Sequence, residues 1–344
     1  MTQVLQQDVL TEAGSSRSFL RTSRLSLLWR DGLLATTTWL AAAWSAVAWP
    51  DVVKWNDTTL WSWLMIGGAV IWAAFSVIMP WTIRFPRLRG TVGALRRNGP
   101  WLIALGVVFA LWEVLTAKLG WLPKPFFSPP QGLLHTYVTD WNRLLFSILY
   151  SLRLWSVGFG LGIVVGFVIG VALGWSRRFN YWGMPLLKLI GPMPATAWLP
   201  FVFFIFPTNF SASAFLIALA SGIPVAILTA SGVATTNQAY YDVARTLGAR
   251  DRFLVLKVAV PASLPHVFVG LFMGLYYSFA VLVVAEMLGA KFGLGWYLQF
   301  YTGYSAYANV DACLLVMALL CAGIVKLLFV VRSRVLAWQE QGLI

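Results

Sequence analysis

Charged residues are scarce in this chain. Only 11% of its 344 residues are Asp, Glu, Lys or Arg, and 59% are hydrophobic. An average soluble domain carries about 25% charged residues, so an ordinary soluble protein is excluded. Repeated apolar runs of about 20 residues predict transmembrane helices instead. Because the runs lack the alternation of a membrane barrel, the predicted fold is an all-α, polytopic membrane helical bundle.

Residues that bind metals or form disulfides are also few. Cys313 and Cys321 lie in one apolar run and cannot bridge within a helix, while His135 and His266 stand apart from any cluster of Cys, Asp or Glu. We therefore predict no metal site and no catalytic residue. The Gly-x-x-x-x-Gly-Lys-Ser/Thr phosphate loop is missing as well, so any ATP that drives this protein must bind another polypeptide.

Acidic residues number 12 against 25 Lys and Arg, which gives a net charge of +13. The basic residues lie in clusters between apolar runs, an arrangement that indicates cytoplasmic loops under the positive-inside rule rather than nucleic-acid binding. The N-terminus shows no cleavable signal pattern. We expect a multi-pass membrane protein with both termini in the cytoplasm. The clusters are residues 17–30, 84–97, 177–188, 245–257 and 326–334.

The apolar runs predict about eight membrane helices with both ends inside. Composition changes near residue 100, because the first two runs are rich in Trp, a residue typical of membrane interfaces. We therefore divide the chain into an N-terminal arm and two-helix extension, 1–99, and a core, 100–344. The predicted helices are 32–50, 60–83, 100–120, 150–175, a proline-rich region 183–207, 212–234, 266–288 and 311–331.

Five glycines recur at every fourth position from Gly158 to Gly174. A helix turns by about 400° over four residues, so these glycines share one face. Such a face lets a second helix approach closely in lipid. The sequence leaves open whether that helix belongs to the same subunit or to a moving or dimer-forming surface.

Prolines break the region 183–207. They remove backbone donors, and broken backbone at membrane depth persists only where it is buried in protein or lines a cavity. Both a transport pathway and plain kinks fit. The acids Glu113 and Glu286 are the ones placed at membrane depth, where Glu286 fits either an interface group or a substrate gate. The pathway candidates are Pro192, Pro194, Thr196, Trp198, Ser221, Pro224 and Glu286.

A charged stretch near residues 235–265 separates two apolar runs. Its spacing matches, without a gap, the Glu-Ala-Ala, Gly and Pro-x-x-x-Pro pattern of one known loop. Two positions differ, because Asp242 replaces the Glu and Val243 replaces the first Ala. The stretch resembles the cytoplasmic coupling loop of bacterial ABC-importer permeases, where a separate ATPase docks. The residues that this resemblance assigns to ATPase coupling are Asp242, Ala244, Arg245, Gly248, Ala249, Arg252, Pro261 and Pro265.

Further motifs resemble the nitrate, sulfonate, taurine and bicarbonate branch of these permeases. They are the run from Pro192 to Pro200, the segment 215–220, and Ala285–Leu288 followed by Gly293-Leu-Gly295. The resemblance covers about residues 100–331 and departs from the family at Phe204–Thr208.

This resemblance implies a type I importer core in the bacterial inner membrane that forms a channel as a homodimer. Two ABC ATPase subunits would bind ATP and Mg, and an extracytoplasmic binding protein would deliver a small anion. The chain itself would be no enzyme and would hold no cofactor. Two alternatives remain on sequence grounds, a polytopic membrane enzyme and an ion-coupled secondary transporter. The first would need clustered His, Asp or Glu, and the second would favour paired intramembrane charges and an inverted repeat.

Overall fold

The computed structural model describes residues 29–82, 93, 96–122 and 125–340. Every regular element in this part of the chain is a helix, which confirms the predicted all-α class. The helices form two compact units, Met1–Thr139 and Asp140–Ile344. Most of the basic N-terminal arm, the arginines at positions 84, 87 and 89, and the last four residues lie outside the described part.

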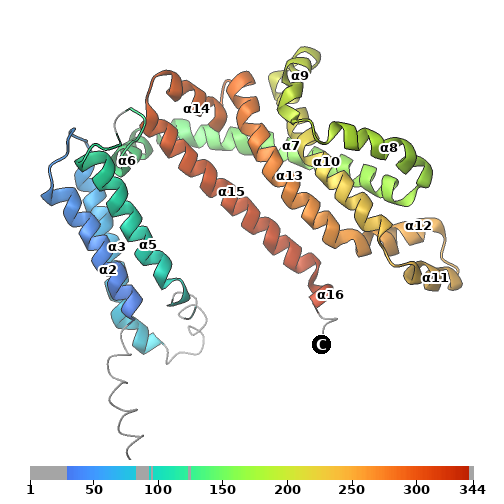
Figure 1. The fold of residues 1–344 in the computed structure, drawn as a ribbon, viewed down its shortest axis with the longest axis horizontal. Coiled ribbons are helices and arrows are strands. Elements are labelled where there is room, and N and C mark those ends of the chain that lie inside the picture. Colours follow the sequence, from blue (N-terminus) through green and yellow to red (C-terminus); the bar gives the residue numbers. More distant parts are fainter. Residues whose placement is uncertain (1–28, 83–92, 94–95, 123–124, 341–344) are drawn as a thin grey trace, which may run out of the picture. The chain divides into compact units, whose positions relative to one another are not determined.

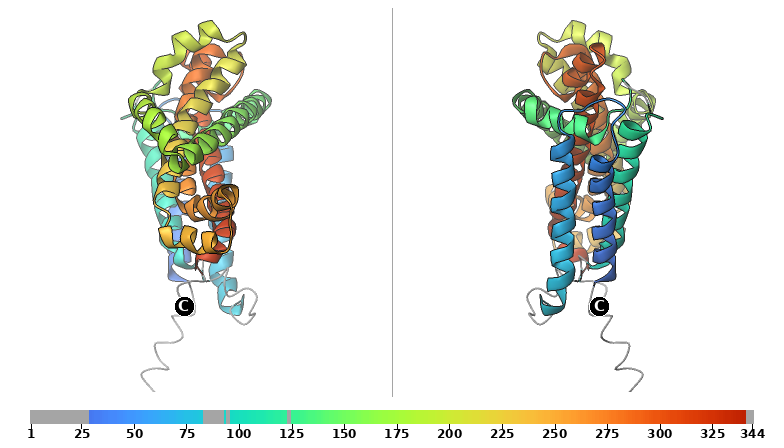
Figure 2. Two further views of the ribbon diagram at one scale, coloured as in Figure 1. Left: turned by 90° about the vertical axis from the view of Figure 1, so that its right-hand side faces the viewer. Right: turned by 90° about the vertical axis from the view of Figure 1, so that its left-hand side faces the viewer.

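Unit 1 is a small helical bundle in which α2 contacts both α3 and α5 (Figures 1 and 2). Small residues of α2 make this possible, because Ala42, Ala43 and Ala46 are buried against the large side chains of Trp61 and Met65 on α3. The four longer helices are α2 (Arg30–Ala48), α3 (Thr58–Thr82), α5 (Gly99–Glu113) and α6 (Pro130–Thr139).

Unit 1 crosses the domain boundary predicted at residue 99. That boundary separates α5 from α2, whereas the indole Nε1 of Trp39 on α2 donates a 3.0 Å hydrogen bond to the carbonyl of Leu102 on α5. The structure groups residues 99–139 with the N-terminal helices, and a functional division at residue 99 stays a prediction.

Unit 2 contains the glycine-rich helix and all the predicted site residues. Its helices are α7 (Trp141–Trp175), α8 (Arg177–Ile190), α9 (Leu199–Ile205), α10 (Asn209–Ala234), α11 (Gln238–Thr246), α12 (Asp251–Phe253), α13 (Val260–Gly289), α14 (Leu294–Gly303), α15 (Tyr307–Val335) and α16 (Ala337–Glu340). The centre of unit 2 is the packing of α10 against α7 and α13.

The glycine face of α7 packs against α10 of the same chain. A Cβ added to Gly170 would lie 2.6 Å from the carbonyl oxygen of Ala226, and one added to Gly174 would lie 2.7 Å from that of Ala230. Only glycine permits backbones so close. Successive glycines meet α10 residues four positions further along, so the helices run in the same direction. Of the two possibilities that the sequence left open, contact within the subunit is the one observed.

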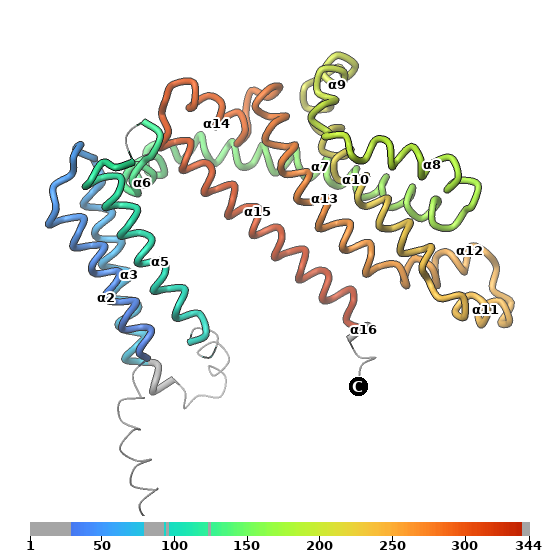
Figure 3. The backbone as a smooth tube through the Cα atoms, viewed as in Figure 1, coloured from blue at the N-terminus to red at the C-terminus, as the bar shows by residue number. Residues whose placement is uncertain are grey.

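Two parallel neighbours require a connection that returns across the unit. Here α8 and the segment Ala195–Ile205 meet at a bend of 90°, with Gly191–Pro194 between them (Figure 3). Pro192 and Pro194 cannot donate the hydrogen bonds that would continue α8. The proline-rich region is therefore a broken segment and not one straight helix.

Among the described residues, six helices are long and apolar enough to cross a membrane, or seven if the bent pair counts as one span. The first predicted span, 32–50, corresponds to α2 and is not among them. Arg30, Asp31 and three threonines lower the hydropathy of α2.

The predicted start of the seventh helix at residue 266 is wrong. Helical structure begins at Asp251 and runs to Gly289, so Pro261 and Pro265 lie within it. A π-helical segment, Leu254–Ala259, precedes both prolines. Local π geometry of this kind helps a membrane helix to satisfy the backbone groups that proline leaves unpaired.

Candidate functional site

Six of the eight predicted coupling residues lie in a helix–turn–helix at one end of unit 2, formed by α11 and α12 (Figure 1). The other two, Pro261 and Pro265, lie on α13. The turn is a Schellman motif: the amide of Gly248 donates to the carbonyl of Arg245 at 2.9 Å, and the amide of Ala249 donates to that of Ala244 at 3.0 Å. Gly248 has a φ of +81°, and no atom lies within 4 Å of an added Cβ. Backbone conformation, not lack of space, is what requires glycine here.

The inner face of this segment is anchored to unit 2. Tyr241 is buried, and its ring meets that of Trp175 at the end of α7 edge-on, with centroids 5.7 Å apart. Ala244 and Ala249 pack against the same cluster, beside buried Leu254. The two alanines of the motif therefore hold the turn against α7 and α10.

The outer face is exposed and partly apolar. Leu247 is 83% exposed, and Val243 and Tyr240 on the same face of α11 are 61% and 60% exposed. Asp242, Arg245 and Arg252 are exposed beside them. Sequence reasoning missed these apolar residues, although their spacing of three and four positions in a stretch outside the apolar runs is the signal of an amphipathic helix.

A second feature is a hollow of about 890 Å³ between the broken segment, α10 and α13. Four of the predicted pathway residues line it, namely Pro192, Pro194, Thr196 and Pro224. The wall is mainly apolar and also carries Tyr277 and Lys188. The irregular backbone of the proline-rich region thus lines a cavity, one of the two arrangements that allow broken backbone within a membrane.

Trp198 and Ser221 do not line this hollow. Trp198 packs against the core of α7, α9 and α10, and its indole nitrogen is buried without a hydrogen-bond partner among the described residues. Ser221 is fully buried, and its hydroxyl donates to the carbonyl of Ile217 at 2.9 Å. An added Cβ at Gly274 on α13 would lie 3.2 Å from the Cα of Ser221, and one at Gly162 on α7 would overlap the Ser221 hydroxyl. Ser221 therefore lies between α7 and α13.

Glu286 is fully buried, close to the end of α13. Its carboxylate accepts a 2.7 Å hydrogen bond from the Ser151 hydroxyl and a 2.8 Å bond from the amide of Gly295 in the first turn of α14. The Ser151 hydroxyl in turn accepts from the amide of Leu294 at 2.8 Å. Glu286 and Ser151 thus cap α14 from two other helices, which provides the acceptors that a helix start needs.

Glycines make this cap possible. A Cβ on Gly293 would lie 2.5 Å from the Glu286 carboxyl carbon, and the φ of Gly293 is +122°. Glu286 does not line the 890 Å³ hollow. α14 folds back over Glu286, and its predicted role as an interface group or a substrate gate stays a prediction.

The far end of α14 is also fixed to unit 2. Tyr297 is fully buried and donates to Asp140 at 2.8 Å, and Asn309 donates to the Tyr297 hydroxyl at 3.0 Å. Tyr301 bonds the same carboxylate. Burial raises the pKa of the Tyr297 phenol above its ordinary value, so the hydroxyl keeps its proton for Asp140. The short helix is thus held at both ends.

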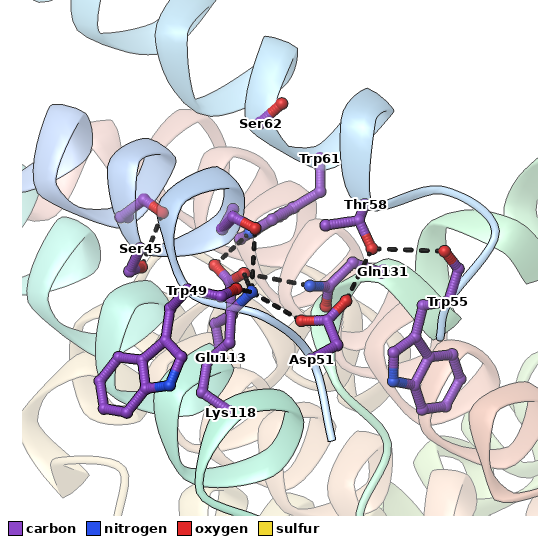
Figure 4. A network of polar contacts seen from close by, with 12 residues as sticks. Ser45, Trp49, Asp51, Trp55, Thr58, Trp61, Ser62, Glu113, Lys118 and Gln131 are labelled. Carbon is purple, nitrogen blue, oxygen red and sulfur yellow. Dashed lines mark hydrogen bonds and ion pairs between the residues drawn. The ribbon is translucent and has the colours of Figure 1, made fainter. Parts of the chain in front are cut away.

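Unit 1 contains its own buried polar network (Figure 4). Lys118 donates to Asp51 at 2.6 Å and to the backbone carbonyls of Ala46 and Trp49. Glu113 lies 3.9 Å from Lys118 and accepts from the indole of Trp61 at 2.8 Å. The network ties the end of α5 to α2, α3 and the connection between them. A cut at residue 99 would remove Asp51 and Trp61 from it.

Residues 162–344 match the family described as binding-protein-dependent transport system inner membrane component. The chain is 26% identical over 256 residues to the nitrate import permease protein NrtB of Synechococcus elongatus. That alignment covers 70% of this chain and 87% of NrtB. It is 30% identical over 243 residues to a probable ABC transporter permease protein of Brucella abortus, over 70% of this chain and 96% of the relative.

Among solved structures, the MetNI methionine ABC transporter in an inward-facing conformation matches with a TM-score of 0.50 and 17% identity. The match covers 57% of this chain and 97% of the other. At this level of identity the likeness concerns the fold alone.

Proposed function

This chain belongs to the family of binding-protein-dependent transport system inner membrane components, and we propose that it moves a small anion through the membrane as the channel of an importer. It is a multi-pass permease subunit of an ABC transporter, and ATP is hydrolysed by a separate ATPase subunit. Family membership does not favour the two alternatives, a membrane enzyme and an ion-coupled secondary transporter.

The proposed assembly contains two copies of this chain, two ATPase subunits that bind ATP and Mg, and an extracytoplasmic binding protein. Both termini and the α11–α12 segment face the cytoplasm in this arrangement. The clustering of Arg245, Arg250 and Arg252 supports that orientation, because basic residues are retained on the cytoplasmic side.

One observation carries the coupling role of α11–α12. The segment is anchored on its inner face through Tyr241, whereas the apolar side chain of Leu247 is 83% exposed at a polar, arginine-rich end of the unit. An exposed apolar patch with a charged rim is typical of a protein interface. Motion of a docked ATPase would reach α7 through the contact between Tyr241 and Trp175. Asp242, Arg245 and Arg252 would form the rim of this interface.

Docking is tested by substitution of Leu247. We expect Leu247→Ser to reduce copurification of the ATPase subunit. The control is Leu319→Ser on α15, a leucine that is 65% exposed but lies outside the segment. Equal recovery of the ATPase with both variants would reject the proposed docking face.

The 890 Å³ hollow is the proposed substrate pathway. Its wall offers the hydroxyls of Thr196 and Tyr277 and, as its one charged group among the described residues, Lys188. Weak binding by a few donors allows an ion to enter and also to leave. The nitrate permease named above supports a small anion of the nitrate, sulfonate, taurine or bicarbonate type. Glu286 is not assigned to this pathway, because its carboxylate caps α14.

Accessibility distinguishes this pathway from alternatives. A single cysteine at position 196 should react with a polar thiol reagent, in a background without Cys313 and Cys321, and added anion should slow the reaction. A cysteine at position 221 should stay unreactive, because Ser221 is buried between helices. The reverse order of reactivity would place the pathway elsewhere.

Transport itself is tested in proteoliposomes that contain this chain, its ATPase subunit and its binding protein. We expect ATP-dependent uptake of labelled nitrate or of another small oxyanion. Uptake of a neutral solute alone would reject the anion assignment. Uptake without ATP would reject the importer.

A further inference from the structure

A third hollow, of about 630 Å³, lies where two helix–helix turns meet. One turn joins α7 to α8 and contributes Trp175, Arg177 and Asn180, while the other joins α10 to α11 and contributes Thr236 and Gln238. Arg245 on α11 completes the wall. The lining is mainly polar, unlike that of the proposed substrate pathway.

The charges in this hollow have one sign. Arg177 and Arg245 line it, and no Asp or Glu does. Within the described part of the chain, no ion pair joins either guanidinium to an acidic group. Each turn brings together the end of one helix and the start of the next, so the helix dipoles largely offset each other. The two arginines therefore decide the electrostatic preference of the site.

The chemistry of these residues defines the ligand. Guanidinium groups bind phosphates and other oxyanions through paired, charge-assisted hydrogen bonds. Tyr181, which lines the hollow, and its neighbour Trp182 are 71% and 75% exposed. Exposed aromatic residues beside arginines are typical of the headgroup region of a membrane. A phosphate held between the turns would touch both α8 and α11.

We infer that this hollow binds an oxyanion, supplied either by the phosphate of an anionic lipid or by a free oxyanion of the cytoplasm. The bound group would bridge the α7–α8 turn and α11. Binding does not depend on the coupling role of α11, whereas an effect of the ligand on transport rests on that proposed function. The two claims are measured separately.

Binding is tested on the purified full-length chain in a nonionic detergent, by tryptophan fluorescence, since Trp175 lines the site. The probes are dioctanoyl phosphatidylglycerol, dioctanoyl phosphatidylcholine and inorganic phosphate. The variant is Arg177→Gln, with Arg178→Gln as the matched control, because Arg178 is the next residue of the same helix and does not line the hollow.

We expect phosphatidylglycerol or phosphate to bind the wild-type chain, and Arg177→Gln to weaken that binding at least tenfold. Arg178→Gln should change it less than twofold. Binding of phosphatidylglycerol without phosphate identifies a lipid site, and binding of phosphate identifies a site for a free oxyanion. Equal effects of the two variants, or equal affinity for phosphatidylcholine, would overturn the inference.

Arg177→Lys keeps the inference testable if Arg177→Gln does not fold. Lysine retains the charge but not the paired donors. The affinity of Arg177→Lys for the ligand should therefore be lower than that of the wild type and of Arg178→Gln, but binding should still be measurable. Wild-type affinity in Arg177→Lys together with a salt-independent signal would also contradict the proposed site. The effect on transport is then read as ATP hydrolysis by the assembled complex with and without the lipid that binds.

Discussion

A methyl group added at Gly170 should force α7 and α10 apart. The new Cβ would lie 2.6 Å both from the Ala226 carbonyl oxygen and from the Cβ of Thr229, about 0.8 Å short of the 3.4 Å at which ordinary contact begins. Neither of these atoms is the end of a flexible side chain. Relief therefore requires movement of one helix relative to the other.

The expected cost follows from the loss of contact. A gap of about 0.5–1 Å forfeits a quarter to a half of each dispersion contact, and overpacking of this kind costs about 1–3 kcal/mol. Replacement of glycine by alanine within a helix also gains up to about 1 kcal/mol. Gly160→Ala is the matched control, because no atom lies within 4 Å of a Cβ at that position of α7. It receives the same gain without the cost.

The assay is the apparent Tm of the two purified variants in detergent, measured as the fraction of protein that stays monodisperse after heating. A difference of 1 kcal/mol shifts the Tm by about 2–4 °C in domains of this size. Gly170→Ala should therefore melt several degrees below Gly160→Ala. Equal melting of the two variants would refute the close helix contact.

Two further predictions concern buried polar groups. Glu286→Ala leaves the Ser151 hydroxyl and the Gly295 amide without their acceptor and should destabilise unit 2 by about 2–4 kcal/mol. Glu286→Gln keeps an acceptor and should destabilise it less, with Met287→Ala as the control. Equal melting temperatures of the two Glu286 variants would contradict the cap. Lys118→Met leaves Asp51 without its ion-pair partner and should destabilise unit 1 by about 3–5 kcal/mol. Limited proteolysis of this variant should be faster than that of the control Lys54→Met, which changes an exposed lysine. Equal rates of proteolysis would contradict the network.

Most of the membrane helices of unit 2 could be predicted from the sequence, because long apolar runs have one stable form in lipid. The Schellman turn was also within reach, since Gly248 follows a short amphipathic stretch. What the sequence did not determine is which face of each helix meets which neighbour. Ser221 and Thr196 are both hydroxyl residues near prolines, yet Ser221 lies between α7 and α13 and Thr196 lies in the wall of the 890 Å³ hollow.

The two buried acids illustrate the same limit. Helix rise places Glu286 near the end of its helix, but burial depends on α14, which folds back through Gly293 and Gly295. Glu113 is buried by Lys118, a residue only five positions away, together with Trp61 and Gln131. Trp61 and Gln131 come from α3 and α6, so spacing along one helix does not reveal them.

The most direct test of the coupling role measures substrate taken up per ATP hydrolysed in proteoliposomes that carry Gly248 variants. The φ of +81° is costly for most residues, by about 1–2 kcal/mol, is tolerated by Asn, and is a real outlier for a β-branched residue. Space does not limit either side chain. The account predicts that Gly248→Asn keeps a near-normal ratio and that Gly248→Val lowers it while the ATPase still binds. A normal ratio in Gly248→Val would contradict the claim that this turn transmits the work of the ATPase.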